Sequence, residues 1–509
     1  MKTKIFTLLL LALPFLVSAQ TLTIASGATV TIGPGASMTT GTFNNEAGVG
    51  GMLIQSDATG QGTFIFDTDG ANGTNATVQI FVPEGTADHH WHFVAPMTTN
   101  AKARDFFYDD AHDAWLYRYQ PDVSQGDAWK PTVDLDSLLP LGSGYSYIWR
   151  TNPPSRENVA GTVTFEGPLS ASALSVSLTL GTDSAQSFNL IGNPYSSTID
   201  LEQGPGSSTG LEKTFWIWDR VNNQYAWGSY TTITYPGEDI LHGLVAMGQA
   251  FFLRATAAGA HADFDPQMRV PDNTAFYKKS NADEDYANHL KLVASNGDYT
   301  DKIFVTFAED GSEDFEDGDV TKLFGGVTAP QLYLPVQDRK QSINYIASLS
   351  ETEERIVPFN YRAGKDGEQT FTFTTQYLLD TYVLLEDTKT GIKVDIMNKP
   401  VYTFTASKED NEDRFLLHFN WSPTGIENPA AEQLVGIYSY DKTVYISNKD
   451  NSFTQTSTIS IHDMYGRLLY SNDAVLGATT KIPVQASNTY LVVRVKNASG
   501  IYTNKVFIK

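Results

Sequence analysis

An internal repeat limits the folds open to this chain more than any other feature of its sequence. Three landmarks recur in the same order: HFVAPMTTN as FNLIGNPYSS, WLYRY as WIWDR, and GSGYSYIWR as AMGQAFFLR. The matched residues are separated by 98 positions for Pro96 and Pro194, by 101 for Trp115 and Trp216, and by 104 for Gly144 and Gly248 and for Arg150 and Arg254. Because the order is kept while the spacing grows slowly, we expect a duplicated β-rich module with small loop insertions over residues 81–270.

The runs between turn-forming residues have the alternation of β-strands. In each landmark aromatic and polar residues alternate, and Gly, Pro and Asn bound the runs. The same pattern fills residues 271–419, where HLKLVAS, DKIFVTFAE, QTFTFTT, TYVLLED and RFLLHF follow one another. No stretch of the repeat has a convincing helical period. The sequence therefore predicts an all-β, multidomain chain of β-sandwich-like units.

Residues 1–19 have the pattern of a secretory signal peptide. Two lysines precede an apolar run, and a small-residue site predicts cleavage between Ala19 and Gln20. Residues 22–45 then form three eight-residue lines, LTIASGAT, VTIGPGAS and MTTGTFNN. Such lines predict a short β-repeat, stacked line on line, that forms a cap or stalk over residues 20–80. A flexible leader rich in Gly and Thr is the alternative.

Composition excludes several functional classes. The 509 residues include 58 acidic and 35 basic ones, and the formal net charge of −23 opposes binding to nucleic acid and to anionic membranes. There is no cysteine, so disulfides, thiolate metal sites and cysteine nucleophiles are excluded. After the signal peptide, no segment has the roughly 18 uninterrupted apolar residues that a transmembrane helix needs. We expect an exported chain whose domains are held together by apolar burial.

The C-terminal part carries a resemblance to a known family. NWSPTGIENPAAEQ predicts a linker over residues 420–433, and residues 434–509 predict a small β-sandwich. In STISIHDMYGRLLYS, TYLVVRVKN and GIYTNKVFIK this unit resembles the type A sorting domain of the type IX (Por) secretion system. The residues that match the family's pattern are Asp463, Gly466 and Arg467 in a turn, Tyr490 in a strand, and Gly500, Lys505, Val506 and Ile508 in the closing strand. Asn488 and Thr489 replace the glycine that usually precedes the Tyr strand.

The rest of the chain resembles the β-rich body of secreted Bacteroidota surface proteins that end in such a sorting domain. The segments that carry this likeness are WHFVAPM, FNLIGNPY, FWIWDR, GQAFFLR, KLFGG and RFLLHF. The two resemblances imply export by the signal peptide and then by the type IX machinery, to the medium or the outer cell surface. They also imply that the sorting domain is removed during release or during anchoring to lipopolysaccharide. They give a location and not an activity.

The segment ADHHWHFVAP raises the question of a metal site. A His-x-His pair such as His90 and His92 can ligate zinc or copper, but it supplies only two ligands. On a strand these two share one face, while His89, Trp91 and Phe93 share the other. The matched segment of the second copy, AQSFNLIGNP, has no histidine. We therefore interpret the histidines as strand residues and predict no metal site there.

Two loops have the spelling of functional motifs. GSSTG (206–210) resembles a hydrolase nucleophile elbow, but it lies in a loop rich in Gly and Ser with no helix expected after it. In AEDGSEDFEDGDVTK, Asp310, Ser312 and Asp314 repeat the first ligands of a calcium loop, but Phe315 stands where that loop needs Gly. We interpret both as solvated loops, with weak Ca²⁺ binding left as the alternative for the second. We predict no other cofactor.

Tryptophans concentrate in the duplicated module: Trp91, Trp115, Trp129, Trp149, Trp216, Trp218 and Trp227. Because Trp115 and Trp216 occupy matched positions, the favoured interpretation is that the rings fill two β cores. Exposed rings that stack on sugars are the alternative. The sequence thus predicts a non-enzymatic surface, adhesion or interaction protein with no catalytic residue. A carbohydrate-binding protein is the alternative, and a hydrolase comes third because no nucleophile, base and orienting group can be assembled. Expected partners are the type IX machinery and surface polysaccharide or lipopolysaccharide.

Overall fold

The structure is a computed structural model that divides into two compact units. Met1–Trp421 is called the body below, and Ser422–Lys509 the C-terminal unit. The residues described are 19–84, 91–107, 112–123, 127–151, 159–182, 187–203, 208–220, 222–229, 243–272, 288–315, 318–349, 354–375, 378, 381–420, 435–440, 442–448, 456–463, 467–497 and 500–508. Residues 1–18 of the predicted signal peptide and residues 421–433 of the predicted linker lie outside this set.

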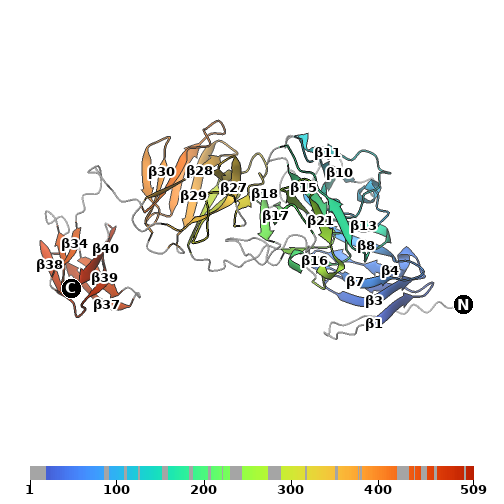
Figure 1. Ribbon diagram of the computed structural model, residues 1–509, viewed down its shortest axis with the longest axis horizontal. Helices are drawn as coiled ribbons and strands as arrows, with labels where there is room; N and C mark the ends of the chain where they lie inside the picture. The colour runs from blue at the N-terminus through green and yellow to red at the C-terminus, as the bar shows by residue number, and fades with distance from the viewer. Residues whose placement is uncertain are drawn as a thin grey trace. The chain divides into compact units, whose positions relative to one another are not determined.

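Nearly all of the regular structure consists of β-strands, which confirms the predicted all-β fold class (Figure 1). The helices in the described part of the chain are short 3-10 turns, namely η1 (Val49–Gly51), η2 (Ala103–Phe106), η5 (Leu201–Gln203) and η7 (Pro266–Met268). Among the residues that the structure describes, no helix is long and apolar enough to cross a membrane.

In the N-terminal part of the body the chain alternates between two parallel sheets. β1 (Ala19–Ile24), β3 (Ser37–Asn45) and β7 (Thr63–Asp69) pair in one sheet (Figure 1). β2 (Val30–Ile32), β4 (Met52–Ile54) and β8 (Asn75–Val82) pair in the other. Each turn of this coil contributes one strand to each sheet, as in a β-solenoid. The rings of Phe43 and Phe64 meet edge to face in its core, 4.8 Å apart.

The predicted line length of this repeat is wrong. Eight-residue lines would place Leu22 beside Val30, but Leu22 pairs with Phe43, 21 residues later. Phe43 pairs in turn with Asp69, 26 residues later. The turn of the coil is longer because the chain has to enter the second sheet and return before it can stack on itself.

The two copies of the internal repeat form four-stranded sheets with the same strand order. The first repeat sheet has the order β11 (Trp129–Pro131), β10 (His112–Tyr119), β12 (Tyr145–Thr151), β9 (His92–Val94). The second repeat sheet has the order β18 (Gln224–Ser229), β17 (Leu211–Asp219), β20 (Ala250–Ala255), β15 (Phe188–Gly192). In both, the first strand of the copy lies at one edge and pairs with the fourth. A flanking pair also recurs, β8 with β13 (Gly161–Pro168) and β14 (Leu174–Ser177) with β21 (His261–Phe264).

Main-chain hydrogen bonds join the two copies reciprocally. The amide of Ala95 donates to the carbonyl of Gly248 over 2.8 Å, and the amide of Gly192 donates to the carbonyl of Gly142 over 2.9 Å. Gly142 and Gly248 both adopt left-handed backbone conformations, with φ of 80° and 72°, which favour glycine. The structural counterpart of Gly248 is therefore Gly142, and not Gly144 as the sequence match predicts. The first copy is two residues longer between this glycine and the matched arginine, since Arg150 follows Gly142 by eight positions and Arg254 follows Gly248 by six.

The remaining part of the body is an 11-stranded sheet, called the bent sheet below. Its order is β31 (Ile392–Asp395), β30 (Val383–Asp387), β33 (Phe415–Phe419), β28 (Arg355–Arg362), β26 (Gln331–Val336), β27 (Arg339–Ala347), β24 (Thr300–Ala308), β23 (His289–Ser295), β29 (Gly367–Thr374), β32 (Val401–Ala406), with β25 (Val320–Thr321) paired to β27. Its ends pack face to face, since Phe359 of β28 lies 5.6 Å from Phe371 of β29. One continuous sheet thus supplies both layers of a sandwich.

Small sheets complete the body: β16 (Thr198–Asp200) pairs with β19 (Leu244–Val245) and β22 (Arg269–Val270), and β5 (Ser56–Asp57) pairs with β6 (Gly60–Gln61).

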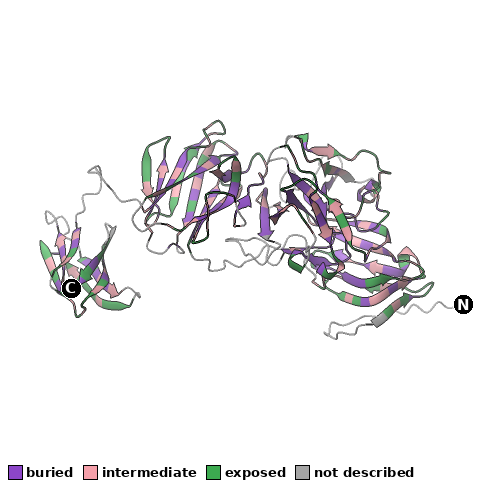
Figure 2. Cartoon of the chain, viewed as in Figure 1, coloured by how far each residue is buried: buried purple, intermediate pink, exposed green. Residues whose placement is uncertain are grey.

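The C-terminal unit consists of a three-stranded and a four-stranded sheet. The first has the order β34 (Val435–Tyr440), β35 (Thr443–Asn448), β38 (Thr479–Pro483), and the second β37 (Leu468–Val475), β36 (Thr456–Asp463), β39 (Thr489–Asn497), β40 (Gly500–Ile508). Aliphatic side chains of both sheets form one core. Buried and exposed residues alternate along many strands of both units, as expected for sheets with one covered face (Figure 2).

Candidate functional site

A cavity of about 560 Å³ lies where the two repeat sheets meet the bent sheet. Its volume falls within the range of small-molecule sites in proteins. Most of the side chains around it are aromatic. The lining residues are Trp91, Phe93, Tyr117, Trp129, Ser146, Trp218, Tyr225, Phe324, Gly325, Gly326, Val327, Gln331 and Arg362. We call it the aromatic cavity.

The first repeat sheet supplies one wall of the aromatic cavity. Trp91 precedes β9 and Phe93 lies within it, and both face the cavity, as the alternation of side chains along a strand predicts. Val94, on the opposite face of β9, packs into the core shared with the coil. The ring of Phe93 is a centre of contacts, with centroid distances of 5.7 Å to Trp129 and 6.0 Å to Trp218. The rings support one another, which fixes their orientation.

The second repeat sheet supplies the next wall. Trp218 of β17 and Tyr225 of β18 are direct cross-strand partners, and their rings meet edge to face at 5.0 Å. Burial, with a smaller contribution from Tyr119, raises the pKa of Tyr225 well above its usual range. Burial also raises the pKa of Tyr119 to about 12. Tyr225 lines the cavity as a neutral ring and hydroxyl group, and Tyr119 packs behind it in the adjoining core.

The third wall comes from KLFGG (322–326) and the residues after it. Lys322 is buried and lies 2.5 Å from the carboxylate of Asp301, which also accepts the amide of Leu332 over 2.6 Å. Leu323 joins the core shared with the repeat sheets. Phe324, next in sequence, lines the aromatic cavity. The buried ion pair of Lys322 and the apolar packing of Leu323 thus hold the segment in place, and this positions the ring of Phe324 in the cavity wall.

Two glycines in this segment allow it to touch the second repeat sheet. The amide of Gly326 donates to the carbonyl of Asn223 over 2.8 Å. A Cβ atom at Gly325 would lie 2.2 Å from Oε1 of Gln224 and 2.5 Å from the carbonyl oxygen of Asn223. Gln331 then holds the loop, because its Oε1 accepts the amide of Gly325 over 3.1 Å. Our sequence interpretation did not identify this wall, although a Gly-Gly pair after an aromatic residue is a signal of close backbone approach.

Arg362 is the charged residue among those that line the aromatic cavity. Its Nε and Nη2 atoms lie 3.0 and 2.9 Å from Oε1 of Glu412. Tyr333 donates to the other carboxylate oxygen over 2.6 Å. Burial raises the pKa of Glu412, but the hydrogen bonds from Tyr333 and Arg362 outweigh it and hold that pKa below its usual value. The guanidinium charge is thus compensated where it meets the cavity.

The structure divides the tryptophans of the duplicated module into two groups. Trp216, Trp227 and Trp149 are buried, with exposed fractions of 0%, 2% and 8%. Trp91, Trp129 and Trp218 line the aromatic cavity. Trp115 lies between these cases: it is half-buried, and the guanidinium of Arg150 covers its ring at 4.1 Å. The burial of Trp216, Trp227 and Trp149 agrees with core filling, whereas the three cavity rings are half-buried and sugar stacking on them stays a prediction.

Of the three histidines in the His-rich segment, the structure describes one. His92 is buried in β9, whereas His89 and His90 lie outside the described residues. Among the residues that the structure describes, no group of three or more His, Asp or Glu side chains is placed to hold a metal ion.

The GSSTG loop brings a hydroxyl, an imidazole and a carboxylate near one another. Thr209 Oγ1 lies 3.4 Å from Nδ1 of His261, and Nε2 of His261 lies 3.5 Å from Asp263. Ser208, the serine of the motif, accepts the amide of Asp263 over 2.8 Å. Both imidazole distances exceed those of a working nucleophile and base, and Nδ1 also faces the carbonyl of Gly259 at 3.2 Å. A strand, β17, follows the loop instead of the helix that a nucleophile elbow requires.

The residues proposed for weak calcium binding take separate protein partners. Tyr345 donates to Asp310 over 2.9 Å, and Gln337 donates to Asp314 over 2.5 Å. The hydroxyl of Ser312 accepts the amide of Asp314 over 3.0 Å. In this structure, hydrogen bonds within the protein hold the loop and use oxygen atoms of Asp310, Ser312 and Asp314.

The residues that resemble a sorting motif lie at one end of β36 and along the last strands. Arg467 donates through its backbone amide and its Nε to Asp463, over 2.9 and 3.0 Å. On β40, Val506 and Ile508 are buried, whereas Lys505 is exposed and lies 4.8 Å over the ring of Tyr490. Gly500 begins β40 opposite Asn497. Gly466 lies outside the described residues.

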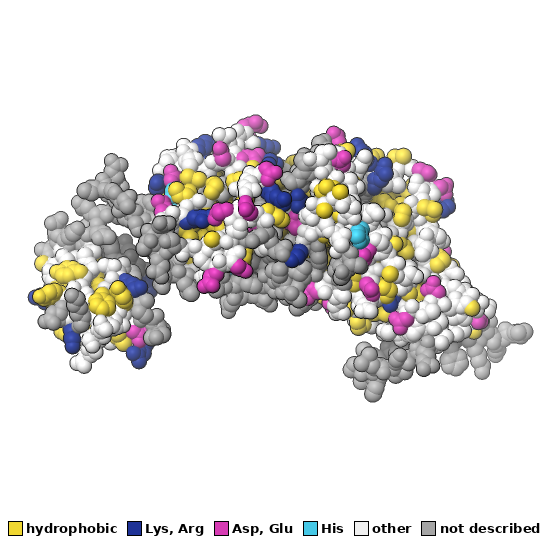
Figure 3. All heavy atoms as spheres, viewed as in Figure 1, with side chains coloured by type: hydrophobic (Ala, Val, Ile, Leu, Met, Phe, Trp, Pro, Cys, Tyr) yellow, Lys and Arg dark blue, Asp and Glu magenta, His cyan; other side chains and the backbone are white. Residues whose placement is uncertain are grey.

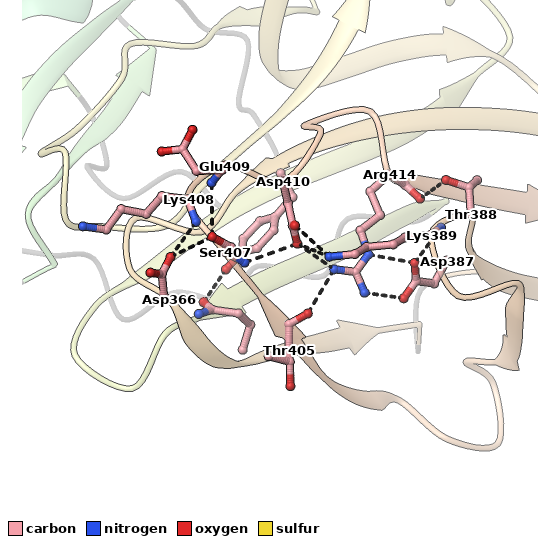
Figure 4. Close-up of polar contacts among 12 residues, drawn as sticks. Asp366, Asp387, Thr388, Lys389, Thr405, Ser407, Lys408, Glu409, Asp410 and Arg414 are labelled. Atoms are coloured by element: carbon pink, nitrogen blue, oxygen red, sulfur yellow. Dashed lines mark hydrogen bonds and ion pairs between the residues drawn. The ribbon is translucent and has the colours of Figure 1, made fainter.

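An ionic cluster of the bent sheet surrounds Arg414 (Figure 4). Its Nε and Nη2 atoms lie 2.7 and 2.6 Å from the two carboxylate oxygens of Asp387, and both side chains are buried. Asp410 lies 3.3 Å from Nη1 of Arg414 and 2.7 Å from Lys389. Ser407 and Lys408 bind Asp366 at the other end of the cluster. Each of these carboxylates faces a donor, so the cluster fastens β30 and β33 to neighbouring loops.

Charges of both signs are scattered over the face of the molecule drawn in Figure 3, with no single field of one sign. On the face drawn there, the described residues form no basic tract of the kind that nucleic acid requires.

Residues 12–419 match the model of a family described as a domain of unknown function, DUF8693. The chain belongs to this family. The DUF8693 match ends where the body ends, so the coil, both repeat sheets and the bent sheet all fall within it. The aromatic cavity is therefore built entirely by DUF8693 residues.

A curated relative of this DUF8693 chain is the minor fimbrium subunit Mfa5 of Porphyromonas gingivalis. It is 22% identical over 505 residues, which cover 91% of this chain and 39% of the relative. The chain thus spans well under half the length of that protein. Two solved structures align over most of the chain, the 47-kilodalton lipoprotein Tp47 of Treponema pallidum and a Ca²⁺-stabilised, ice-binding adhesin of an Antarctic bacterium. The first covers 82% of this chain and 99% of the other at 10% identity and a TM-score of 0.14. The second covers 85% and 97% at 8% identity and a TM-score of 0.12. At these scores neither alignment supports an argument.

Proposed function

We propose that this chain is a non-enzymatic adhesion or interaction protein of the outer cell surface. The observation that carries the proposal is the relationship to a fimbrium subunit over 91% of the chain. The all-β architecture, held together by apolar burial without disulfides, is compatible with this role. The long distances within the GSSTG loop favour a binding role over hydrolysis.

The proposed export route has two signals. The first is a signal peptide that is cleaved between Ala19 and Gln20. The second is the C-terminal unit, recognised by the type IX machinery. Support comes from the exposed Arg467, clamped to Asp463, and from the packing of Val506 and Ile508 in the last strand. In this proposal the unit folds by itself into a compact sorting domain that the type IX machinery recognises.

The test is localisation of the chain in its native host, intact and truncated after Asn428. Protease shaving of intact cells and mass spectrometry of the mature C-terminus report where each form resides. We expect the intact chain on the surface or in the medium and the truncated chain in the periplasm. An Arg467→Ala variant tests the turn by itself, because Arg467 is exposed and its loss leaves the core unchanged. Surface display of the truncated chain would contradict the sorting role.

A second candidate function, extracellular carbohydrate binding, is favoured by the aromatic cavity. The rings of Trp91, Trp129 and Trp218 lie around one space of ligand size. An adhesive surface protein and a glycan-binding protein are compatible roles, because attachment to a surface polysaccharide requires a glycan site. The absence of enzymatic activity is checked by incubating the chain with any polysaccharide that it binds and measuring released reducing ends, of which we expect none.

A further inference from the structure

The aromatic cavity has the composition of a ligand site and not of a packing gap. Apart from Val327, its large apolar lining residues are aromatic, and they come from three different sheets. Val327 is 90% exposed at the rim, so the space reaches solvent. In the bent sheet aromatic rings share the core with aliphatic side chains, and the buried core of the C-terminal unit is built from Leu, Ile and Val alone. An aliphatic or lipid ligand would be accommodated equally well by such side chains, so the choice of flat rings favours a ligand with flat faces.

Charge narrows the class of ligand further. Arg362 is paired with Glu412, so the wall offers no uncompensated charge that would attract an ionic ligand of either sign. An acidic ligand is also opposed by the net charge of −23 that the chain carries. Burial raises the pKa of Tyr225 further above physiological pH, so this lining phenol adds no charge to the cavity. A neutral ligand remains.

We propose that the aromatic cavity binds a neutral glycan, whose sugar faces stack on Trp91, Trp129 and Trp218. The hydroxyl groups of such a ligand would reach solvent at the rim, because the main-chain amides of Gly325 and Gly326 are already hydrogen-bonded within the protein. This inference rests on the proposed role as a surface interaction protein, since it names the class of partner. It also gives a reason for the contact between KLFGG and the second repeat sheet, because that contact closes the third side of the site.

The test uses the purified full chain and four neutral polysaccharides: cellulose, a β-1,3-glucan, starch and a mannan. Sedimentation with insoluble polymer and titration with the soluble oligosaccharides report binding, and quenching of tryptophan emission reports contact with the cavity rings. We expect binding to at least one of them. Trp129→Ala and Trp91→Ala should weaken it by about tenfold or more, because each removes a stacking face. Trp129→Phe keeps an apolar ring and should lose less.

The matched control is Tyr299→Ala, which removes a half-buried ring that does not line the cavity. It should bind as the unchanged chain does. Circular dichroism and thermal unfolding establish that each variant is folded, and if an alanine variant unfolds, the phenylalanine variant decides. The proposal is overturned if the folded chain binds none of the four polymers, or if the cavity variants bind with unchanged affinity. It is equally overturned if a polyproline peptide, and no glycan, quenches the cavity tryptophans. Because export plays no part in this test, its failure is distinguishable from failure of the localisation experiment.

Discussion

The guanidinium of Arg254 lies 3.0 Å from the carboxylate of Glu212, and the two side chains are only 4% and 3% exposed. Glu212 also accepts the backbone amide and the hydroxyl of Thr321, over 2.9 and 2.7 Å. The pair therefore connects the second repeat sheet to β25 of the bent sheet. The matched Arg150 of the first copy instead covers the ring of Trp115. The matched arginines of the two copies thus make different contacts, and Arg254 of the second copy helps to join the second repeat sheet to the bent sheet.

Glu212→Ala should lower the free energy of unfolding of the body by about 3–5 kcal/mol, because it leaves the Arg254 charge buried without its carboxylate. Chemical denaturation followed by tryptophan emission measures this. Arg104→Ala is the control, since its ion pair with Asp136 is exposed and should contribute less than about 1 kcal/mol. Similar losses for both variants would show that burial of the Glu212 pair is unimportant.

Acid should destabilise the bent sheet through Asp387. Burial raises the pKa of this carboxyl, but hydrogen bonds from Arg414 and Tyr402 outweigh it and hold the pKa at about 2, below the unfolded value of 3.8. A lowered folded pKa gives stability that is fully present above about pH 4 and is lost as the pH falls towards 2. The contribution is on the order of 2 kcal/mol. Unfolding midpoints measured from pH 6 to pH 2 should fall less steeply in Asp387→Asn; an unchanged slope would refute this assignment.

Gly325→Ala should weaken the third wall of the aromatic cavity. The new methyl group would meet the carbonyl of Asn223, which cannot move without β18, so we expect a loss of about 1–3 kcal/mol. Thermal unfolding together with glycan binding measures both consequences. Gly50→Ala is the matched control, because a Cβ there meets open space. Equal behaviour of the two variants would mean that the close approach at Gly325 is dispensable.

Ile508→Ala should destabilise the C-terminal unit by about 2–5 kcal/mol, because its side chain is 1% exposed in the core. Phe507→Ala, one residue earlier and 38% exposed on the opposite face, should cost much less. Hydrogen exchange of the β39 and β40 amides in the full chain distinguishes the two. Protection that falls equally in both variants would contradict the alternation of the last strand.

Local alternation made much of the fold predictable. HLKLVAS coincides with β23, and TYLVVRVKN coincides with β39. The pairing in the coil was harder to predict. The partner of Leu22 depends on where the chain re-enters the first sheet after crossing the second, and not on the next segment of similar sequence. The same limit applies to Gly142. Its left-handed φ identifies it as the equivalent of Gly248 in the other copy, although the sequence match favours Gly144.

The candidate site was only partly predictable. Alternation places Trp91 and Phe93 on one face, but it does not say whether that face meets core or cavity. The answer depends on Phe324, more than two hundred residues later in the chain, which packs there through contacts that no local pattern encodes. Trp216 and Trp218 illustrate the difficulty, since they lie two residues apart on β17 and yet one is core and the other lines the cavity.

The reciprocal bonds of Ala95 with Gly248 and of Gly192 with Gly142 make each copy of the repeat the complement of the other. A polypeptide with one copy would present an amide and a carbonyl at this seam, and association with a second molecule of itself would satisfy both in the same way. Joining the copies in one chain converts that association into an intramolecular step that no longer depends on protein concentration. Dilution outside a cell, which separates the subunits of a weak dimer, leaves a fused pair intact.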